Sequence, residues 1–515
     1  MWQRTRRAGL VVAAALALVA CGTTGVPESS GGAAPGTGST PGSPTASAVA
    51  GPVPGGDWVN FDADAARSGI GPSDTGITAA NVGSLRARRV TLDGIADSAA
   101  VEVHGVRALG SRRDLVVVTT SYGRAIAVDA QTGRLVWQFM PAGIDGAPGN
   151  PQVTTAGPVV DPDRRFVYSA APNGTVSKLA LATGRPVWTR AITLDPAHEK
   201  LASALNVAGG SVVVQTGGYI GDIPPYDGHL VTIDRTSGRI VHVFNSECSN
   251  RHRLIRAASC RVTDTRGDDA MWGRAGAVIE PGSGRILTAT GNGPFDGSTN
   301  WGNSALELSP DASRLLHNWT PTNWRTLDSG DVDVGSASPA VLPPFHGRRL
   351  AVQGGKDGRL HVLDLTRLDG TTAGAGKRLG GELSETSTPG GAQLLTAPAV
   401  WSRGGRIDVF VGTDGGTAAY ELVDPGHPRL RVLWHRSTAA TSPVLAGGLL
   451  YLYDEIDGSL VVRQPLTGAL VRAFPVAPGH WNSPIVVGGR VILPTGSYHD
   501  SSRTSTLVIL HLPGR

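Results

Sequence analysis

The sequence predicts an all-β protein, built as a single eight-bladed β-propeller of four-stranded antiparallel blades. Its 70 Gly and 35 Pro among 515 residues argue against a helix-rich fold, because both residue types destabilise helix interiors. From about residue 57 onward, short apolar strands alternate with Gly-containing turns, which is typical of β-meanders. Eight similar strand openings recur along this stretch, and four strands for each opening is the repeat of a propeller blade.

The strand pattern is clearest in the first repeat. Apolar residues 116–119 lead through a Gly turn to residues 125–129, and a Gln-Thr-Gly hairpin at 131–133 connects these to Leu135-Val136-Trp137. The Asp/Thr-Gly turns supply the positive φ that a tight hairpin demands. Similar units follow near residues 166–188, 229–238, 360–364 and 458–468.

A small residue, often followed by proline, marks the start of each predicted inner strand. Small residues are expected there because inner strands crowd the central channel of a propeller. We expect residues 85–92 to supply an N-terminal strand that closes the last blade. The eight openings are residues 98–100, 157–159, 203–205, 276–278, 338–340, 397–399, 442–444 and 483–485.

The first twenty residues predict an export signal, in which three arginines precede a short apolar run at residues 10–20. That run is too short to span a bilayer, which takes roughly twenty residues. The sequence Leu18-Val19-Ala20-Cys21 resembles the lipobox of bacterial lipoproteins, which implies cleavage before Cys21 and lipidation of its sulfur. The alternative is an ordinary secretory signal, and the export route, Sec or twin-arginine, stays open.

Residues 21–56 form a predicted disordered tether ahead of the propeller at 57–515. They are almost all Gly, Ser, Thr, Pro and Ala, a composition that cannot bury a core. The expected protein is therefore exported, monomeric and attached by lipid to the outer face of the cell membrane. The whole chain has a net charge of +4, and removing the three arginines of the leader leaves +1, so no nucleic-acid partner is expected.

Two cysteines remain once Cys21 is assigned to lipid. Cys248 and Cys260 are an even pair in an oxidising compartment, and we predict that a disulfide joins them and closes a short loop. Two free thiols are the alternative. None of the three cysteines lies in a Cys-x-x-Cys-His segment, so no covalently bound haem is expected.

The run Asp-Ala-Gln-Thr-Gly-Arg-Leu-Val-Trp at residues 129–137 resembles the tryptophan-docking repeat of quinoprotein alcohol dehydrogenases and their relatives, the PQQ-like propellers. Residues 57–61 and 67–69 are similar to the N-terminal segment of such propellers, and the resemblance extends from residue 57 to the end. It implies that Trp137, Trp188 and Trp434 pack between blades.

The same resemblance implies an axial site for pyrroloquinoline quinone (PQQ) and Ca²⁺, a hard cation that prefers oxygen ligands. Trp272 lies where the tryptophan of the family stacks on the quinone, and Asn292 where its asparagine binds Ca²⁺. Asp331 or Asp333 lies where an aspartate accepts the alcohol proton, and Asp331 is also a candidate Ca²⁺ ligand. The axial pocket is expected to include Asp296, Asn303 and Lys356. The alternative is that these polar residues only form turns.

Two features of the dehydrogenases are missing. Ile220 follows the Gly-Gly pair after which the family has a glutamate ligand, and isoleucine offers a metal no oxygen. Asp222 or Asp227 is an alternative ligand. The adjacent cysteine pair that lies against the quinone in many relatives is also absent.

These losses favour a non-catalytic, lipid-anchored propeller that uses one face to bind a protein or other ligand of the cell envelope. The propeller lipoprotein scaffold of outer-membrane barrel assembly resembles this arrangement at the level of fold. The alternative function is a PQQ- and Ca²⁺-dependent dehydrogenase of alcohols or sugars. A merely structural envelope protein is a third interpretation, which the sequence does not separate from the first.

Overall fold

The computed structural model describes residues 56–144, 151–219, 223–260, 269–368, 378–499 and 502–513. The predicted leader, the lipidation of Cys21 and the tether up to residue 55 lie outside these residues, as do Ile220 and Asp222. The export signal, the anchor and the tether therefore stay predictions.

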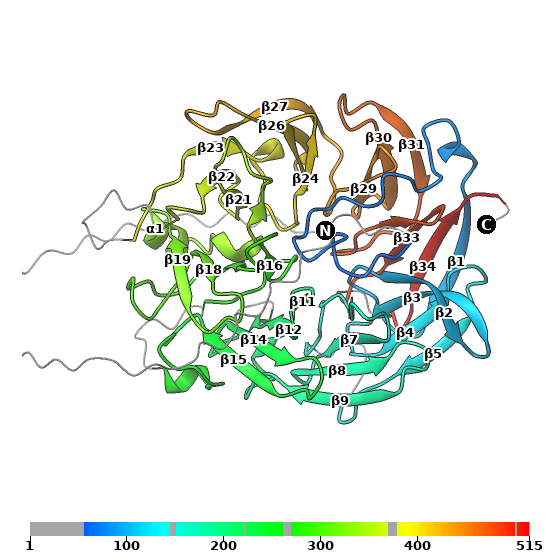
Figure 1. Ribbon diagram of the computed structural model, residues 1–515, viewed down its shortest axis with the longest axis horizontal. Coiled ribbons are helices and arrows are strands. Elements are labelled where there is room, and N and C mark those ends of the chain that lie inside the picture. Colours follow the sequence, from blue (N-terminus) through cyan, green and yellow to red (C-terminus); the bar gives the residue numbers. More distant parts are fainter. Residues whose placement is uncertain are drawn as a thin grey trace, which may run out of the picture. The chain divides into compact units, whose positions relative to one another are not determined.

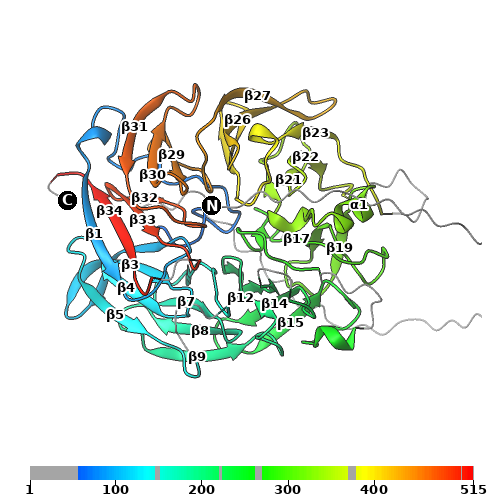
Figure 2. The same cartoon turned by 180° about the vertical axis from the view of Figure 1, so that it is seen from behind.

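Eight four-stranded antiparallel sheets stand around a central axis as the blades of a propeller (Figures 1 and 2), as the sequence predicts. In blades 1 to 7 the strands follow one another from the innermost strand outward. Blade 1 comprises β2 (Val101–Ala108), β3 (Ser111–Thr119), β4 (Ala125–Asp129) and β5 (Leu135–Phe139). Blade 2 comprises β6 (Val159–Val160), β7 (Phe166–Ala171), β8 (Thr175–Ala180) and β9 (Pro186–Ala191). Blade 3 comprises β11 (Asn206–Ala208), β12 (Ser211–Gln215), β14 (His229–Asp234) and β15 (Ile240–Asn245). Blade 4 comprises β16 (Val278–Ile279), β17 (Ile286–Ala289), β18 (Ala305–Leu308) and β19 (Leu315–Trp319).

The other blades repeat this order. Blade 5 comprises β20 (Ala340–Val341), β21 (Leu350–Gly354), β22 (Arg359–Asp364) and β23 (Ser384–Ser387). Blade 6 comprises β24 (Ala399–Arg403), β25 (Arg406–Thr413), β26 (Gly416–Val423) and β27 (Arg429–Arg436). Blade 7 comprises β28 (Val444–Ala446), β29 (Leu449–Asp454), β30 (Ser459–Arg463) and β31 (Leu470–Pro475). Outside the blades lie the ribbon of β10 (Glu199–Lys200) and β13 (Gly217–Gly218), helix α1 (Trp324–Ser329), and 3₁₀ turns at Val82–Ser84, Ala257–Ser259, Val334–Ser336 and Pro389–Gly391.

Blade 8 joins the two ends of the repeating chain. Its inner strands are β32 (Ile485–Val487), β33 (Arg490–Thr495) and β34 (Ser505–His511), and its outermost strand is β1 (Arg86–Leu92). β1 pairs with β34 in antiparallel register from Arg86 opposite His511 to Leu92 opposite Ser505. The predicted N-terminal closing strand is thus confirmed. Each predicted small-residue opening also lies at the start of an innermost strand.

The apolar core lies between neighbouring blades. One buried cluster joins residues of blades 1 and 2, and another joins blades 7, 8 and 1, so the core continues across the closure of the ring. The three predicted docking tryptophans each bridge one blade to the next. Trp137 on β5 donates its indole N–H to the carbonyl of Leu181 in blade 2 at 2.8 Å. A Cβ added to Gly184, which has a φ of 68°, would lie 2.5 Å from the Trp137 ring.

Trp188 on β9 of blade 2 and Trp434 on β27 of blade 6 repeat this geometry. Trp188 donates to the carbonyl of Arg235 at 3.2 Å, and Trp434 donates to that of Pro465 at 2.8 Å. In both cases the ring covers a glycine of the facing hairpin, Gly238 or Gly468. The Thr/Ser-Gly hairpins of the repeat are therefore shaped to receive the tryptophan of the preceding blade.

An N-terminal segment (residues 57–72) runs through the middle of the ring, where Figure 1 draws it in blue. Its backbone pairs with the inner strands of five blades. Trp58 exchanges two backbone hydrogen bonds with Glu102 of blade 1, at 2.7 and 2.8 Å. Backbone N–H groups of blades 2, 4, 6 and 7 donate to carbonyls of the segment, the pairs being Val160 to Val59, Ile279 to Ala65, Val400 to Ser68 and Leu445 to Gly69.

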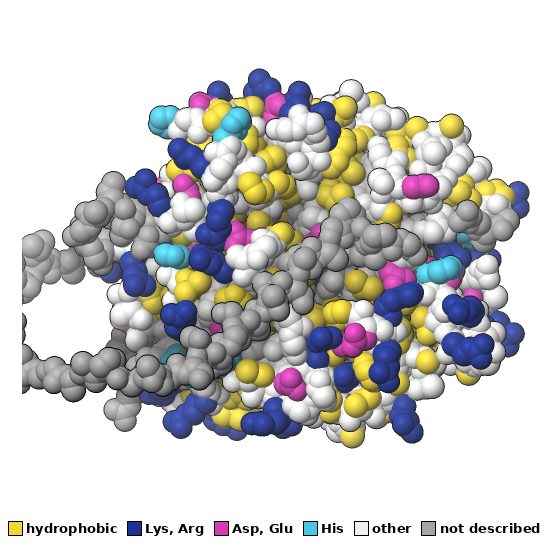
Figure 3. Space-filling view, in the orientation of Figure 1, with side chains coloured by type: hydrophobic (Ala, Val, Ile, Leu, Met, Phe, Trp, Pro, Cys, Tyr) yellow, Lys and Arg dark blue, Asp and Glu magenta, His cyan; other side chains and the backbone are white. Residues whose placement is uncertain are grey.

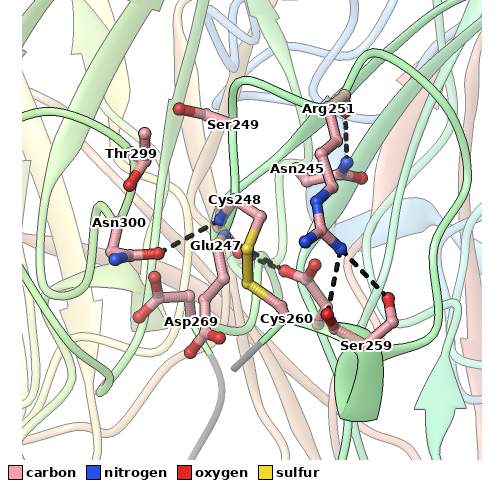
Figure 4. The surroundings of a disulfide bond; sticks show 12 residues. Asn245, Glu247, Cys248, Ser249, Arg251, Ser259, Cys260, Asp269, Thr299 and Asn300 are labelled. Carbon is pink, nitrogen blue, oxygen red and sulfur yellow. Dashed lines mark hydrogen bonds between the residues drawn. A yellow bond between two sulfur atoms is a disulfide. The ribbon is translucent and has the colours of Figure 1, made fainter. Parts of the chain in front are cut away.

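The predicted disulfide between Cys248 and Cys260 is confirmed, and Figure 4 shows its surroundings. Asn300 accepts a hydrogen bond from the Cys248 N–H at 3.1 Å, and Arg251 donates to the carbonyl of Ser259 at 3.0 Å. In the part of the chain that the structure describes, no helix is long and apolar enough to cross a membrane. On the face seen in Figure 3, basic and acidic side chains are interspersed with uncharged ones.

Candidate functional site

Three of the residues predicted for the axial site meet around the ammonium group of Lys356, which lies in the turn between β21 and β22. Lys356 Nζ lies 3.0 Å from Asp331 Oδ1 and 2.5 Å from Asp333 Oδ2, both of which follow helix α1. Asn292, which follows β17, donates from Nδ2 to Asp331 Oδ1 at 3.0 Å. Its backbone N–H donates to Asp333 Oδ1 at 2.7 Å. We call Asn292, Asp331, Asp333 and Lys356 the carboxylate–lysine cluster.

The side chain of Asn303 and the close approach of Gly291 hold this cluster in place. Asn303 donates to Asn292 Oδ1 at 3.1 Å and accepts the N–H of Val334 at 3.0 Å, so one amide links two of the loops. A Cβ at residue 291 would lie 2.5 Å from Asp333 Oδ1, so only glycine lets this carboxylate approach the chain before Asn292.

Burial lowers the pKa of Lys356, but the two carboxylates outweigh burial and leave the pKa raised, so this side chain is charged at neutral pH.

The predicted stacking residue Trp272 lies beside the cluster. Lys356 Nζ is 5.5 Å from the centre of its ring, within range of a cation–π interaction. A second indole, that of Trp481, stacks on Trp272 with 5.9 Å between ring centres and 16° between ring planes. Trp481 was not predicted from the sequence. The only signal was its place two residues before the Ser483-Pro484 opening, where a chain segment reaches the axis.

Two further cations approach Trp481. Lys200 Nζ lies 5.7 Å from the Trp481 ring and 4.9 Å from the ring of Tyr498. Arg274 donates from Nε and Nη2 to the Trp481 carbonyl at 3.0 and 2.8 Å, and also donates to the carbonyl of Thr155 across the axis. Burial lowers the pKa of Lys200 to about 8, against the opposing charge of Asp97. The axis therefore combines stacked indoles with several cations.

A buried carboxylate, that of Asp97, holds the segment that carries His480 and Trp481. Asp97 Oδ2 lies 2.9 Å from His480 Nδ1, and Asp97 Oδ1 accepts the N–H of Trp481 at 2.9 Å. His480 in turn stacks on Trp481 with 4.8 Å between ring centres. Burial would raise the pKa of Asp97, but the neighbouring imidazole and the Trp481 N–H lower it to about 2.

The lowered pKa of Asp97 predicts an acid-dependent stability. A carboxyl group whose folded pKa is depressed stabilises the fold above its unfolded pKa of about 3.9 and loses that contribution as the pH falls through its folded pKa. For Asp97 the contribution is about 2 kcal/mol, lost between about pH 4 and 2. Urea unfolding of wild type and of Asp97→Asn should therefore differ at pH 6 and converge toward pH 2. A difference that stays constant with pH would contradict this assignment.

Other predicted residues lie apart from the cluster. Asp296 Oδ1 accepts the backbone N–H groups of Ser298, Thr299 and Asn300, so it forms a turn, the alternative that the sequence left open. Asp227, the alternative metal ligand, is fully buried and accepts hydrogen bonds from the Ser246 hydroxyl and the Glu247 N–H. Neither residue contributes an oxygen to the carboxylate–lysine cluster among the contacts of the described residues.

The residues on the axis suit a planar anion better than they suit a metal ion. Two indoles and three cations are the groups that would bind an aromatic polycarboxylate such as PQQ. For Ca²⁺ the cluster offers two carboxylates and one amide oxygen, which are hard donors but fewer than the six to eight oxygens that this ion takes. Among the described residues no group of three or more His, Cys, Asp and Glu side chains could hold a metal. These residues alone do not complete a Ca²⁺ site.

Comparison with known proteins identifies the repeat. A PQQ-like repeat model described as outer membrane protein assembly factor BamB matches residues 74–312 and 123–473. Quinohemoprotein alcohol dehydrogenase ADH IIB of Pseudomonas putida is 25% identical over 341 residues, 61% of this chain and 46% of that protein. The dehydrogenase subunit of a quinone alcohol dehydrogenase of Acetobacter aceti is 25% identical over 286 residues, 48% of this chain and 37% of that protein.

The matched region thus spans less than half the length of either relative. Among solved structures, quinohemoprotein alcohol dehydrogenase from Comamonas testosteroni superposes with a TM-score of 0.65 at 16% identity, over 89% of this chain and 81% of that one. At that identity the likeness concerns the fold alone. A family model matches well over half of the residues, and the strand order and the docking tryptophans agree with it. This chain therefore belongs to the PQQ-like β-propeller repeat family.

Proposed function

We propose that the axial site binds PQQ and that the protein is a quinone-dependent oxidoreductase of alcohols or sugars. The observation that carries the proposal is the meeting of an indole, a lysine and two carboxylates at one point, with Lys356 in contact with both the indole and the carboxylates. The similarity of this chain to two quinone-dependent alcohol dehydrogenases supports the same function. The sequence alone favours a scaffold over this function, whereas the relatives favour the oxidoreductase.

Each residue has a role that follows from its surroundings. Trp272 would stack on the quinone plane, while Lys356, Lys200 and Arg274 would balance its carboxylates. When bound, PQQ supplies a two-electron acceptor for the oxidation of an alcohol. The side chain of Asp331 is 67% exposed, so it can take the hydroxyl proton of a substrate, whereas that of Asp333 is 9% exposed and holds the Asn292 backbone.

Trp481 must move for a ligand to enter between the two indoles. Each ring-to-ring contact needs about 3.5 Å, so a planar ligand between two rings separates their planes by roughly 7 Å. The centres of Trp272 and Trp481 are 5.9 Å apart. Binding should therefore displace Trp481 and change the tryptophan fluorescence of the protein.

Calorimetry with PQQ, with and without Ca²⁺, tests the proposal on the purified mature protein. We expect saturable binding that is lost in Trp272→Ala and retained in Trp401→Ala, which removes an indole on β24 of blade 6. Dye-linked oxidation of alcohols and sugars should then depend on Asp331 and fall at least a hundredfold in Asp331→Asn. Absence of binding heat together with absence of oxidation would refute the function.

The titration of Lys200 predicts how quinone affinity depends on pH. Because burial lowers its pKa to about 8, this cation is lost from the free protein as the pH rises above that value. A charge-assisted contact contributes about 1.5–3 kcal/mol, so affinity for the anionic quinone should fall roughly tenfold between pH 7.5 and 9.5. Lys200→Met should bind more weakly at pH 7.5 and lack this fall. Parallel pH profiles for the two proteins would contradict the role of Lys200.

A ligand-binding role without catalysis is the second candidate. It is favoured by one observation, that Lys356 already balances Asp331 and Asp333 while Trp481 covers Trp272. In that case the site is complete without a cofactor, and a face of the propeller would bind an envelope ligand.

In either case we propose attachment to the outer face of the membrane through Cys21, which Cys21→Ala tests in membrane fractions. Release of that variant into the soluble fraction is the expected result. If the variant stays with the membranes, the lipid anchor is wrong.

A further inference from the structure

A cavity of about 650 Å³, half open to solvent, lies beside the carboxylate–lysine cluster, between helix α1, which follows blade 4, and strands β22 and β23 of blade 5. Lys356 lines this cavity as well as contacting Asp331 and Asp333, so the cavity and the cluster share one side chain. At about 30 Å³ for each water, the volume would hold roughly twenty water molecules. This is far more space than a short aliphatic alcohol fills.

The lining of the cavity is polar. Eight of its eleven lining residues carry a charge or a hydrogen-bonding side chain. The three apolar ones, Pro321, Leu327 and Val332, come from the segment around α1. An apolar ligand would displace water from these polar groups without replacing its hydrogen bonds, which lowers affinity.

Several polar lining residues pair with one another or with a neighbouring side chain. Asp357 lies 2.8 Å from His361 Nε2, and Glu385 lies 3.3 Å from Arg359 Nη1. Glu382 accepts the indole N–H of Trp319 through Oε2 at 2.9 Å. A carboxylate accepts several hydrogen bonds, so each of these groups keeps acceptor capacity for a ligand hydroxyl. The lining is thus a preformed set of acceptors and donors.

The charges of the lining residues determine which ligand charge the cavity accepts. Asp357, Glu382 and Glu385 face only two permanent cations, Lys356 and Arg359. An anionic ligand would meet an excess of negative charge, whereas a neutral one would not. Alternating donors and acceptors beside an apolar strip match the hydroxyl groups and C–H face of a carbohydrate.

We infer that this cavity binds a neutral polyhydroxylated ligand, a hexose or hexitol, and presents one of its hydroxyl groups toward Lys356 and Asp331. The inference rests on the proposed function for its chemistry, since it names the substrate class of the same site. Binding in the cavity itself uses only Thr322, Asn323, Glu382 and their neighbours, and needs no cofactor.

Calorimetry on the full mature protein without PQQ tests this inference with sorbitol, gluconate and 1-butanol as probes. We expect sorbitol to bind at least tenfold more tightly than gluconate or 1-butanol. Asn323→Ala and Glu382→Gln should each weaken sorbitol binding at least tenfold. Asn323 is exposed and makes no side-chain cap to α1, so its replacement should leave the fold intact. Gln131→Ala, an exposed amide on the hairpin of blade 1, is the matched control and should bind as wild type does.

The outcomes separate this inference from the proposed function. Quinone binding with equal affinities for sorbitol and 1-butanol would overturn the substrate class and leave the oxidoreductase standing. Sorbitol binding that needs Asn323 and Glu382, in a protein that binds no PQQ, would keep the cavity assignment and remove the oxidoreductase. Tighter binding of gluconate than of sorbitol would overturn the inference through its charge argument.

Discussion

Replacing Arg67 with methionine is expected to destabilise the propeller by about 3–5 kcal/mol, because it removes a buried cation that holds the N-terminal segment in the axis. Arg67 is 2% exposed and donates to the carbonyl of Phe61 at 2.9 Å and to that of Leu205 at 2.7 Å. Its guanidinium also lies 5.9 Å from the Phe61 ring and next to the buried Asp62. Without it, two buried carbonyls lose their charged donors, and Asp62 loses the positive charge that acts on it most strongly.

The measurement is the midpoint of urea unfolding, followed by circular dichroism. Arg107→Met is the matched control, because Arg107 is an exposed arginine on β2 of blade 1 and should change stability by no more than about 0.5 kcal/mol. If both variants unfold at the wild-type midpoint, the N-terminal segment does not contribute to the stability of the ring.

The second large effect is expected for Trp137→Ala, which should cost about 3–5 kcal/mol by emptying the contact between blades 1 and 2. The side chain of Trp137 is 7% exposed in the cluster that joins these blades, and its indole covers Gly184. The flanking strands cannot close the gap, because each is held by the hydrogen bonds of its own sheet.

A phenylalanine at the same position separates packing from hydrogen bonding. Trp137→Phe keeps most of the ring against Gly184 but loses the bond to the Leu181 carbonyl, which should cost only about 1–2 kcal/mol. Unfolding midpoints of the two variants give the comparison. Equal losses in both would mean that the hydrogen bond, and not the ring, joins the blades.

Much of the fold could be predicted because its determinants are local. The small residues at 157–159 or 442–444 indicate crowding at the axis. The Gly of each hairpin indicates a positive φ beneath a docking indole. The order of the eight blades follows from these signals alone. The strand at 85–92 was predictable because an incomplete last repeat leaves one edge that needs a partner.

The N-terminal segment could not be predicted in the same way. Its hydrogen bonds to five blades are made by backbone groups, so they leave no residue pattern around Ala65 or Ser68. The stacking of Trp481 on Trp272 depends on two loops that are far apart in the sequence. The cluster of Asn292, Asp331, Asp333 and Lys356 could be predicted only from the resemblance to quinoprotein alcohol dehydrogenases, since its members come from three separate turns.

The pairing of β1 with β34 also sets the order in which the protein can be completed. β1 is synthesised long before β34 (Ser505–His511), which is its strand partner among the described residues. Until that strand exists, β1 presents an unpaired edge, which is a site for wrong pairing with other chains. Folding of blade 8 therefore has to wait for the synthesis of β34, and truncation before residue 505 should leave the ring open rather than one blade smaller.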